Sequence, residues 1–265
     1  MKTKTYYYSD ERNDDFGTMG HSDKPLPKDF KYVHTNIFFR VWAFILYFCI
    51  VLPILFCYTK IVYGIKINNR KVLKDLKKKN IGVFMYGNHT HNIDAFSIHV
   101  LVSPRKRSYA VSNAAAVTFS KFVGLLVMQL GCLPLPSSYE NVRGFKEAMK
   151  KRVDDGNFIV IYPEAHEWPY FTGVRDFPAT SFKYPVILDK PVVFFSTTYH
   201  KRKFFNKILK PRIEVTLSDV FYPNKELCVN DAAMDLRNKC YNFLKEGTKN
   251  NTIEAYKYIY KEKSL

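Results

Sequence analysis

The sequence predicts an α/β fold with a mostly parallel central sheet flanked by helices, preceded by a membrane-embedded helix. Short apolar runs alternate with amphipathic segments from about residue 80 onward, which is typical of a layered α/β domain. An uncharged apolar run, residues 41–58, precedes that region. We therefore expect a polar segment over residues 1–36, a membrane helix over 37–60 and one folded domain over 61–265.

Each element of the folded domain follows from local composition. Strands are predicted where short apolar runs are bounded by turn residues, and helices where apolar residues recur with helical spacing. The predicted strands are 82–86, 108–111, 132–135, 158–162, 192–198 and 213–217. The predicted helices are 93–102, 117–130, 138–154 and 232–259, and residues 178–188 are mixed and interrupted by Pro185. In such sheets functional residues collect where strands end at their carboxyl edge.

The apolar run 41–58 reaches the lower length limit of a membrane-spanning helix, which is about 17 residues. Arg40 and Lys60 bracket it, and Pro53 is predicted to kink or break it. A full span, a kinked helix embedded in one leaflet and a buried core helix remain as alternatives. Lys and Arg are frequent just after the run, which favours a folded domain on the cytoplasmic side.

The charge of the chain points to anionic partners. The formal net charge is +17, of which residues 59–265 carry +16. Nucleic acid, an acidic membrane surface and an acidic carrier protein all fit a basic protein. The apolar run, and a sequence without a recognisable nucleic-acid-binding motif, favour membrane lipid and argue against nucleic acid. The five cysteines are widely spaced and form no CxxC pair, so we expect neither a zinc site nor a disulfide framework.

A His and an Asp follow the first strand of the domain, in the run GNHTHNIDAF at 87–96. On one helix His89 and Asp94 would point about 140° apart. They can pair if His89 lies in the turn before a helix and Asp94 in its first turn. A His held by an Asp is a general base with a fixed tautomer. The sequence contains no GxSxG elbow, so the nucleophile is expected to come from the substrate.

Two other interpretations of the His89–Asp94 pattern remain open at this point. In one, the Asp caps a helix and the His is structural. In the other, these two residues bind a metal together with His91 and His99. A second predicted strand has a carboxylate at its end, because residues 158–162 run directly into Pro163 and Glu164. That places Glu164 at the same sheet edge as His89. This favours the interpretation of His89 as a general base.

Four sequence blocks occur in one order: NHTHNID at 88–94, GCLPL at 131–135, YPE at 162–164 and KPVV at 190–193. This ordered set resembles the glycerolipid acyltransferase family, which includes the 1-acyl-sn-glycerol-3-phosphate (lysophosphatidic acid) acyltransferases. The resemblance covers about residues 80–200. It implies an α/β acyltransferase domain that works at the membrane surface, with no metal or other cofactor.

The resemblance also implies a reaction. His89 would activate the hydroxyl of a lysolipid and Asp94 would orient His89. The hydroxyl would attack an acyl thioester carried by coenzyme A or acyl carrier protein. The first acceptor that the resemblance implies is 1-acylglycerol-3-phosphate, in phospholipid synthesis. Gly131, Pro163 and Glu164 fall in the blocks that bind the acceptor.

The sequence departs from the family at two places. Ser137 stands at the arginine of the second block, and Ala165, His166 and Glu167 replace the Gly-Thr-Arg that follows the family's Pro-Glu. Those positions help to hold the acceptor phosphate in the family, and Arg is a preferred phosphate ligand. Arg143, Lys146 and Arg175 are the candidate substitutes. A glycolipid or another hydroxylated acceptor, and a non-enzymatic lipid-binding relative, are therefore kept as alternatives.

Overall fold

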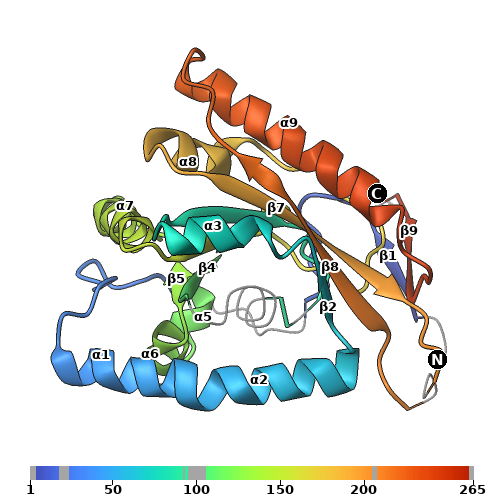
Figure 1. Cartoon of the computed structure of the whole chain (residues 1–265), viewed down its shortest axis with the longest axis horizontal. Helices are drawn as coiled ribbons and strands as arrows, with labels where there is room; N and C mark the ends of the chain where they lie inside the picture. Colours follow the sequence, from blue (N-terminus) through green and yellow to red (C-terminus); the bar gives the residue numbers. More distant parts are fainter. Residues whose placement is uncertain (1–3, 18–23, 92, 95–105, 205–207, 263–265) are drawn as a thin grey trace.

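The computed structural model describes residues 4–17, 24–91, 93–94, 106–204 and 208–262. Within these residues, the central sheet has the strand order β2-β8-β7-β3-β6-β4-β5 (Figure 1). Its strands are β2 (Lys66–Asn68), β3 (Val83–Gly87), β4 (Ser108–Ser112), β5 (Cys132–Pro134), β6 (Phe158–Ile161), β7 (Val192–His200) and β8 (Arg212–Phe221). All neighbours are parallel except β7 and β8, which are antiparallel. The predicted α/β class with a mostly parallel sheet is confirmed.

The two faces of the sheet pack against different helices. Phe84 of β3 lies in a buried cluster with residues of α7 (Tyr139–Asp154) and α9 (Val229–Thr248). Its neighbour Met85 lies in a second buried cluster, on the other face, with residues of α3 (Val72–Lys78). Successive side chains of a strand point to opposite faces, so β3 is apolar at every position because both of its faces are covered. The loops after β3 and β6 therefore start from strands that are buried at the centre of the sheet.

The apolar segment forms one continuous helix of 27 residues from Ile37 to Tyr63, and its most apolar 18-residue stretch has a mean hydropathy of 2.4. It consists of α1 (Ile37–Phe44) and α2 (Leu52–Tyr58), joined and followed by π-helical turns at Ile45–Val51 and Thr59–Tyr63. Among the described residues it is the helix long and apolar enough to cross a membrane. Figure 1 shows it on the opposite side of the molecule from α9. It remains a candidate membrane helix.

Pro53 does not break this helix, which was one of the two outcomes that the sequence predicted for it. It sits in the first turn of α2, directly after the π-helical turns. The N–H of Leu52 there donates to the Tyr47 carbonyl, one residue further back than in an α-helix. We attribute the tolerance to this wider turn, which relieves the clash between a proline ring and the preceding turn. The helix ends where Gly64 adopts a left-handed conformation with φ of 55°.

Two predicted helices have different bounds. The helix predicted at 117–130 is split into α5 (Ala115–Thr118) and α6 (Lys121–Gln129), because Ser120 is extended and its side chain accepts from the Val123 N–H as a new N-cap. The predicted 93–102 helix lies outside the described residues except 93 and 94, which form a turn. The mixed segment 178–188 contains a 3₁₀ turn, Thr180–Phe182, and α8 (Lys183–Ile187), whose first turn accepts Pro185.

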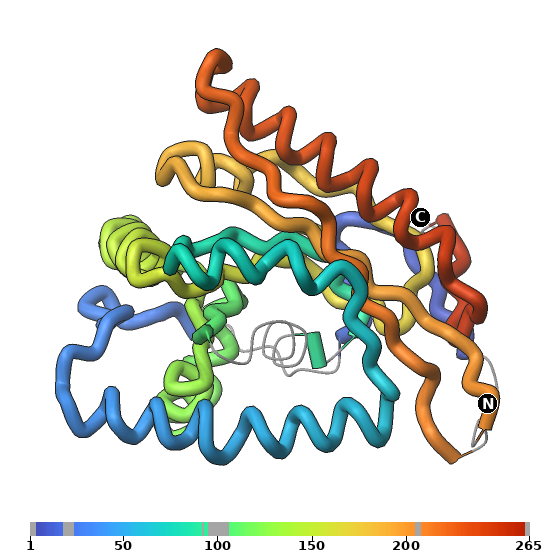
Figure 2. Tube along the Cα trace, viewed as in Figure 1, coloured from blue at the N-terminus to red at the C-terminus, as the bar shows by residue number. Residues whose placement is uncertain are grey.

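The helix predicted at 232–259 is wrong at its C-terminal end. Helix α9 ends at Thr248, and residues Tyr256–Tyr260 form strand β9. β9 pairs in parallel with β1 (Lys4–Tyr8), a strand that the sequence did not predict in the N-terminal segment. The overlooked signal is the tyrosine content of YKYIY and KTYYY, since aromatic residues favour strands. In Figure 2 the blue N-terminal strand runs beside the red C-terminal strand.

Candidate active site

The turn after β3 is fixed by contacts with the neighbouring strand β7. A Cβ on Gly87 would lie 2.1 Å from the ring of Phe195, so any other residue here would have to displace that buried ring. The Asn88 amide then makes two hydrogen bonds with the backbone of Thr197, donating to its carbonyl at 3.0 Å and accepting from its N–H at 2.8 Å. These contacts hold the backbone so that His89 leaves the carboxyl edge of the sheet.

The structure brings His89 and Asp94 together. Nδ1 of His89 lies 3.4 Å from Oδ2 of Asp94. The same carboxylate oxygen accepts from the N–H groups of Thr90 and His91, each at 2.9 Å. The Asp94 side chain is 1% exposed and that of His89 is 19% exposed. Two backbone donors therefore fix the carboxylate, and the carboxylate in turn orients the imidazole.

Tyr162 supports the other side of this pair. Its ring stacks on the imidazole of His89, with centroids 4.5 Å apart and planes at 24°. Its hydroxyl donates to the Asp94 carbonyl at 2.7 Å. With Nδ1 directed at Asp94, Nε2 of His89 is the nitrogen left for a substrate. This is the arrangement of a general base whose Nδ1–H is bonded to a carboxylate.

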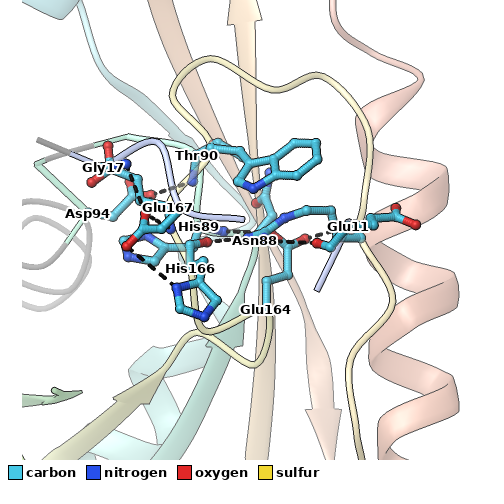
Figure 3. A network of polar contacts seen from close by, with 12 residues as sticks. Glu11, Gly17, Asn88, His89, Thr90, Asp94, Glu164, His166 and Glu167 are labelled. Carbon is cyan, nitrogen blue, oxygen red and sulfur yellow. Dashed lines mark hydrogen bonds and ion pairs between the residues drawn. The ribbon is translucent and has the colours of Figure 1, made fainter. Parts of the chain in front are cut away.

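Glu164 and Arg175 form a buried ion pair behind His89. Oε2 of Glu164 accepts from the Arg175 guanidinium at 3.1 Å and from the His89 N–H at 3.4 Å (Figure 3). Both side chains are at most 1% exposed. Burial raises the pKa of Glu164, while Arg175 and the two backbone donors act to lower it. Glu164 thus links the loop after β6 to the backbone of His89.

The other residues predicted to bind the acceptor lie in different settings. Arg143 is exposed on α7, where it pairs with Glu147 one turn away. Gly131 has φ of 102° before β5, and a Cβ there would lie 2.3 Å from the Ser108 carbonyl, so its glycine is required by the turn. Pro163 is buried two positions after the end of β6. The guanidinium of Arg175 faces Glu164. The acceptor-binding roles assigned to these four residues remain predictions.

His91 has a structural environment. Its ring is bonded to the Tyr170 hydroxyl at 3.2 Å and accepts from the Ile93 N–H at 3.2 Å. Burial, together with Lys210 and His89, lowers its pKa to about 4, although Asp94 acts to raise it. Among the described residues, no group of three or more His, Cys, Asp or Glu side chains is placed to hold a metal. His99, the fourth residue of the metal hypothesis, lies outside the described residues.

Three residues that the sequence did not assign to the site border it. Asp15, from the N-terminal segment, lies 3.4 Å from Nδ1 of His166 and accepts from the Glu167 N–H at 3.3 Å. Glu167 is 7% exposed, and burial raises its pKa to about 7. His166 and Glu167 were noticed as departures from a family pattern, whereas Asp15 gave no signal because 152 residues separate it from Glu167.

The part of the chain that holds this site is similar to a known enzyme family. Residues 65–193 match the model of the Acyltransferase family, and this range includes His89, Asp94 and Glu164. The resemblance to the glycerolipid acyltransferases, carried by four sequence blocks, is thereby confirmed. Residues 65–193, just under half of the chain, are therefore similar to an acyltransferase domain.

One solved structure is similar to the chain over most of its length. It is the 1-acyl-sn-glycerophosphate (LPA) acyltransferase PlsC from Thermotoga maritima, with 17% sequence identity and a TM-score of 0.53. The similarity covers 80% of this chain and 86% of that chain. At this identity the likeness shows a shared fold. No curated protein matches the chain in sequence.

Proposed function

We propose that the chain is a membrane-bound O-acyltransferase that moves an acyl chain from a thioester to the hydroxyl of a lysolipid. The donor is acyl-coenzyme A or an acyl carrier protein thioester, and no metal takes part. The observation that carries the proposal is the His89–Asp94 pair, at 3.4 Å, within the region that matches the Acyltransferase family.

In the proposed mechanism the acceptor hydroxyl is the nucleophile. Nε2 of His89 takes its proton as the hydroxyl oxygen attacks the thioester carbonyl carbon, and Asp94 stabilises the imidazolium. The tetrahedral intermediate then collapses, the carbon–sulfur bond breaks, and His89 returns the proton to the thiolate. The products are an ester and a free thiol. Tyr162 and Glu164 act by holding His89 in place.

Two features support a position at the membrane surface. The helix Ile37–Tyr63 has 17% of its most apolar stretch buried inside the protein, so most of it is open to lipid. The loop between β7 and β8, residues 201–211, has five basic and no acidic residues, and its Phe204 and Ile208 are 77% and 81% exposed. Arg202 ties this loop to the end of the helix by donating to the Val62 carbonyl. Figure 2 shows both on the lower side of the molecule. Such basic and apolar surfaces suit the cytoplasmic face of an anionic bilayer.

The acceptor first expected is 1-acylglycerol-3-phosphate. A second class, acceptors whose headgroup is not a phosphate monoester, is favoured by the carboxyl group of Glu167 beside His89. The test is a panel of lysolipids offered to purified wild type and His89→Ala, with oleoyl-coenzyme A and oleoyl-acyl carrier protein as donors. We expect ester formation by the wild type and a loss of at least about 100-fold in His89→Ala. Substantial transfer by His89→Ala would refute the mechanism, and no product with any acceptor would favour a non-enzymatic lipid-binding protein.

A further inference from the structure

The N-terminal segment, residues 4–17, packs against the loop that carries Glu164. Strand β1 pairs in parallel with β9. The indole N–H of Trp168 donates to the Asp14 carbonyl at 2.7 Å, and the N–H of Phe16 donates to the Glu167 carbonyl at 3.1 Å. The N-terminal segment is therefore held in place here, by backbone pairing with β9 on one side and by the bonds of Phe16 and of the Trp168 indole on the other.

The loop of residues 164–168 is attached to His89 at both ends. The His89 N–H donates to the Glu164 carboxylate, and the Trp168 N–H donates to the His89 carbonyl at 3.2 Å. The residues between these two attachments, His166 and Glu167 among them, necessarily lie close to the candidate base. Figure 3 shows both side chains next to His89.

Asp15 connects the N-terminal segment to the loop of residues 164–168. Its Oδ1 accepts from the N–H groups of Gly17 at 2.8 Å and Glu167 at 3.3 Å, and its Oδ2 faces Nδ1 of His166 at 3.4 Å. The His166 side chain is 36% exposed. Within the described part of the chain, Nε2 of His166 has no protein partner and is free to contact a ligand.

Glu167 provides an independent sign of a ligand. The residue is 7% exposed, yet its Oε1 has no hydrogen-bond partner among the described residues. Buried carboxyl oxygens in proteins are nearly always hydrogen-bonded, so an orphan beside the candidate base leaves a place for a donor, which a bound substrate can supply. Burial, Asp94 and Asp15 all raise the pKa of this carboxyl, while His89 lowers it.

The negative charge around His89 disfavours the binding of an anionic ligand. Asp15, Asp94, Glu164 and Glu167 all border its loop. Among the described residues bonded to this group, Arg175 is the permanent cation, and its guanidinium is already paired with Glu164. A phosphate dianion would meet carboxylates here, whereas a hydroxyl can donate to them.

We propose that Asp15, His166 and Glu167 form the headgroup-binding part of the acceptor site, and that they select an uncharged hydroxylated headgroup, glycerol or a sugar, over a phosphate monoester. This inference rests on the proposed function, because the bound lipid would be the acceptor of the acyl chain. The headgroup selectivity itself is a property of binding and can be measured without the reaction. The N-terminal segment thereby becomes part of the acceptor site.

The test measures binding without an acyl donor, so that no reaction takes place. Full-length protein in detergent is titrated at pH 8 with monooleoylglycerol, a glucosyl monooleoylglycerol and oleoyl-lysophosphatidate, and bound lipid is quantified by native mass spectrometry. We expect the two uncharged lipids to bind at least about tenfold more tightly than lysophosphatidate. Glu167→Gln and Asp15→Asn should each reduce this ratio severalfold, because they remove negative charge and keep the shape. Glu246→Gln, on the exposed face of α9, is the matched control and should leave the ratio unchanged.

The outcomes separate the two proposals. Tighter binding of lysophosphatidate, an unchanged ratio in Glu167→Gln, or no binding of any of the three lipids would overturn the headgroup inference. Selective binding of the uncharged lipids without transfer from either thioester would overturn the proposed acyl transfer and leave the headgroup inference standing. Thermal unfolding of each variant checks that the fold is retained.

Discussion

The backbone N–H of His89 donates to the carboxylate of Glu164, so a residue at the end of β6 holds the candidate base at the end of β3. The two strands are parallel neighbours in the sheet, with Tyr86 opposite Ile161. Their carboxyl ends are therefore side by side, and one hydrogen bond crosses from loop to loop. The same carboxylate is held from behind by Arg175. A contact that serves the fold thus also sets the position of the reacting group.

Removing one partner of this ion pair should destabilise the protein strongly. Arg175→Met leaves the Glu164 carboxylate buried without its cation, which typically costs about 3–5 kcal/mol. Lys249→Gln, which breaks an exposed pair with Glu246, should change stability by less than about 0.5 kcal/mol. Denaturant unfolding of both variants measures the difference. Equal effects in the two variants would show that Glu164 and Arg175 are not the buried pair described.

Asp94→Asn should impair catalysis more than it impairs folding. The asparagine oxygen can still accept from the Thr90 and His91 N–H groups, so the turn is retained. The negative charge that stabilises the His89 imidazolium is lost, and we expect the rate of transfer to fall by about 100-fold or more. Steady-state rates at saturating acceptor, with circular dichroism as the fold control, test this. A rate within a factor of three of the wild type would remove Asp94 from the mechanism.

The centre of the fold could be predicted from the sequence, whereas the contribution of the N-terminal segment to the site could not. The runs GVFMY and FIVIY predict strands because a strand covered on both faces must be apolar throughout, and β3 and β6 are buried at every position. The pairing of His89 with Asp94 could be predicted because only four residues separate them and a turn can join them. Asp15 reaches Glu167 across 152 residues, through a parallel pairing of β1 with β9, and local periodicity carries no information about such a partner.

Glu167 should make stability depend on pH. Its pKa is raised to about 7 in the folded protein, from an ordinary value of 4.5. Between these values the folded state binds more protons than the unfolded state, so this group's contribution to stability falls as pH rises from about 4.5 to about 7. The decrease is at most about 3 kcal/mol, and it should be complete above pH 8. The free energy of unfolding of the wild type minus that of Glu167→Gln, measured from pH 4 to 8, isolates it. A flat difference would mean that the carboxyl is normally ionised.

The loop between β7 and β8 should strengthen attachment to anionic membranes. Phe204 and Ile208 are exposed, and the basic residues of 201–211 are expected to contribute about 1 kcal/mol each near an anionic surface. Phe204→Ser combined with Ile208→Ser should therefore make the protein easier to strip from phosphatidylglycerol vesicles by salt. Tyr222→Ser, exposed just after β8, is the control. Sedimentation at rising salt gives the comparison, and identical release curves would contradict a lipid contact at this loop.

The N-terminal segment should contribute to stability through Phe16. Its ring packs on Trp168 at 5.3 Å and on Tyr258 at 5.6 Å, which joins the segment both to the loop beside His89 and to β9. Because Phe16 is only partly buried, Phe16→Ala should cost less than a full core truncation, about 1–3 kcal/mol. Tyr7→Ala, at a side chain 60% exposed on the same strand pair, should cost under about 0.5 kcal/mol. Native-state hydrogen exchange is the decisive measurement. Loss of the Phe16 ring should speed amide exchange in β1 and at Glu167 and Trp168, whereas the amides of β3 and β6 should stay protected. Faster exchange confined to β1 would mean that the segment pairs with β9 without supporting the loop beside His89.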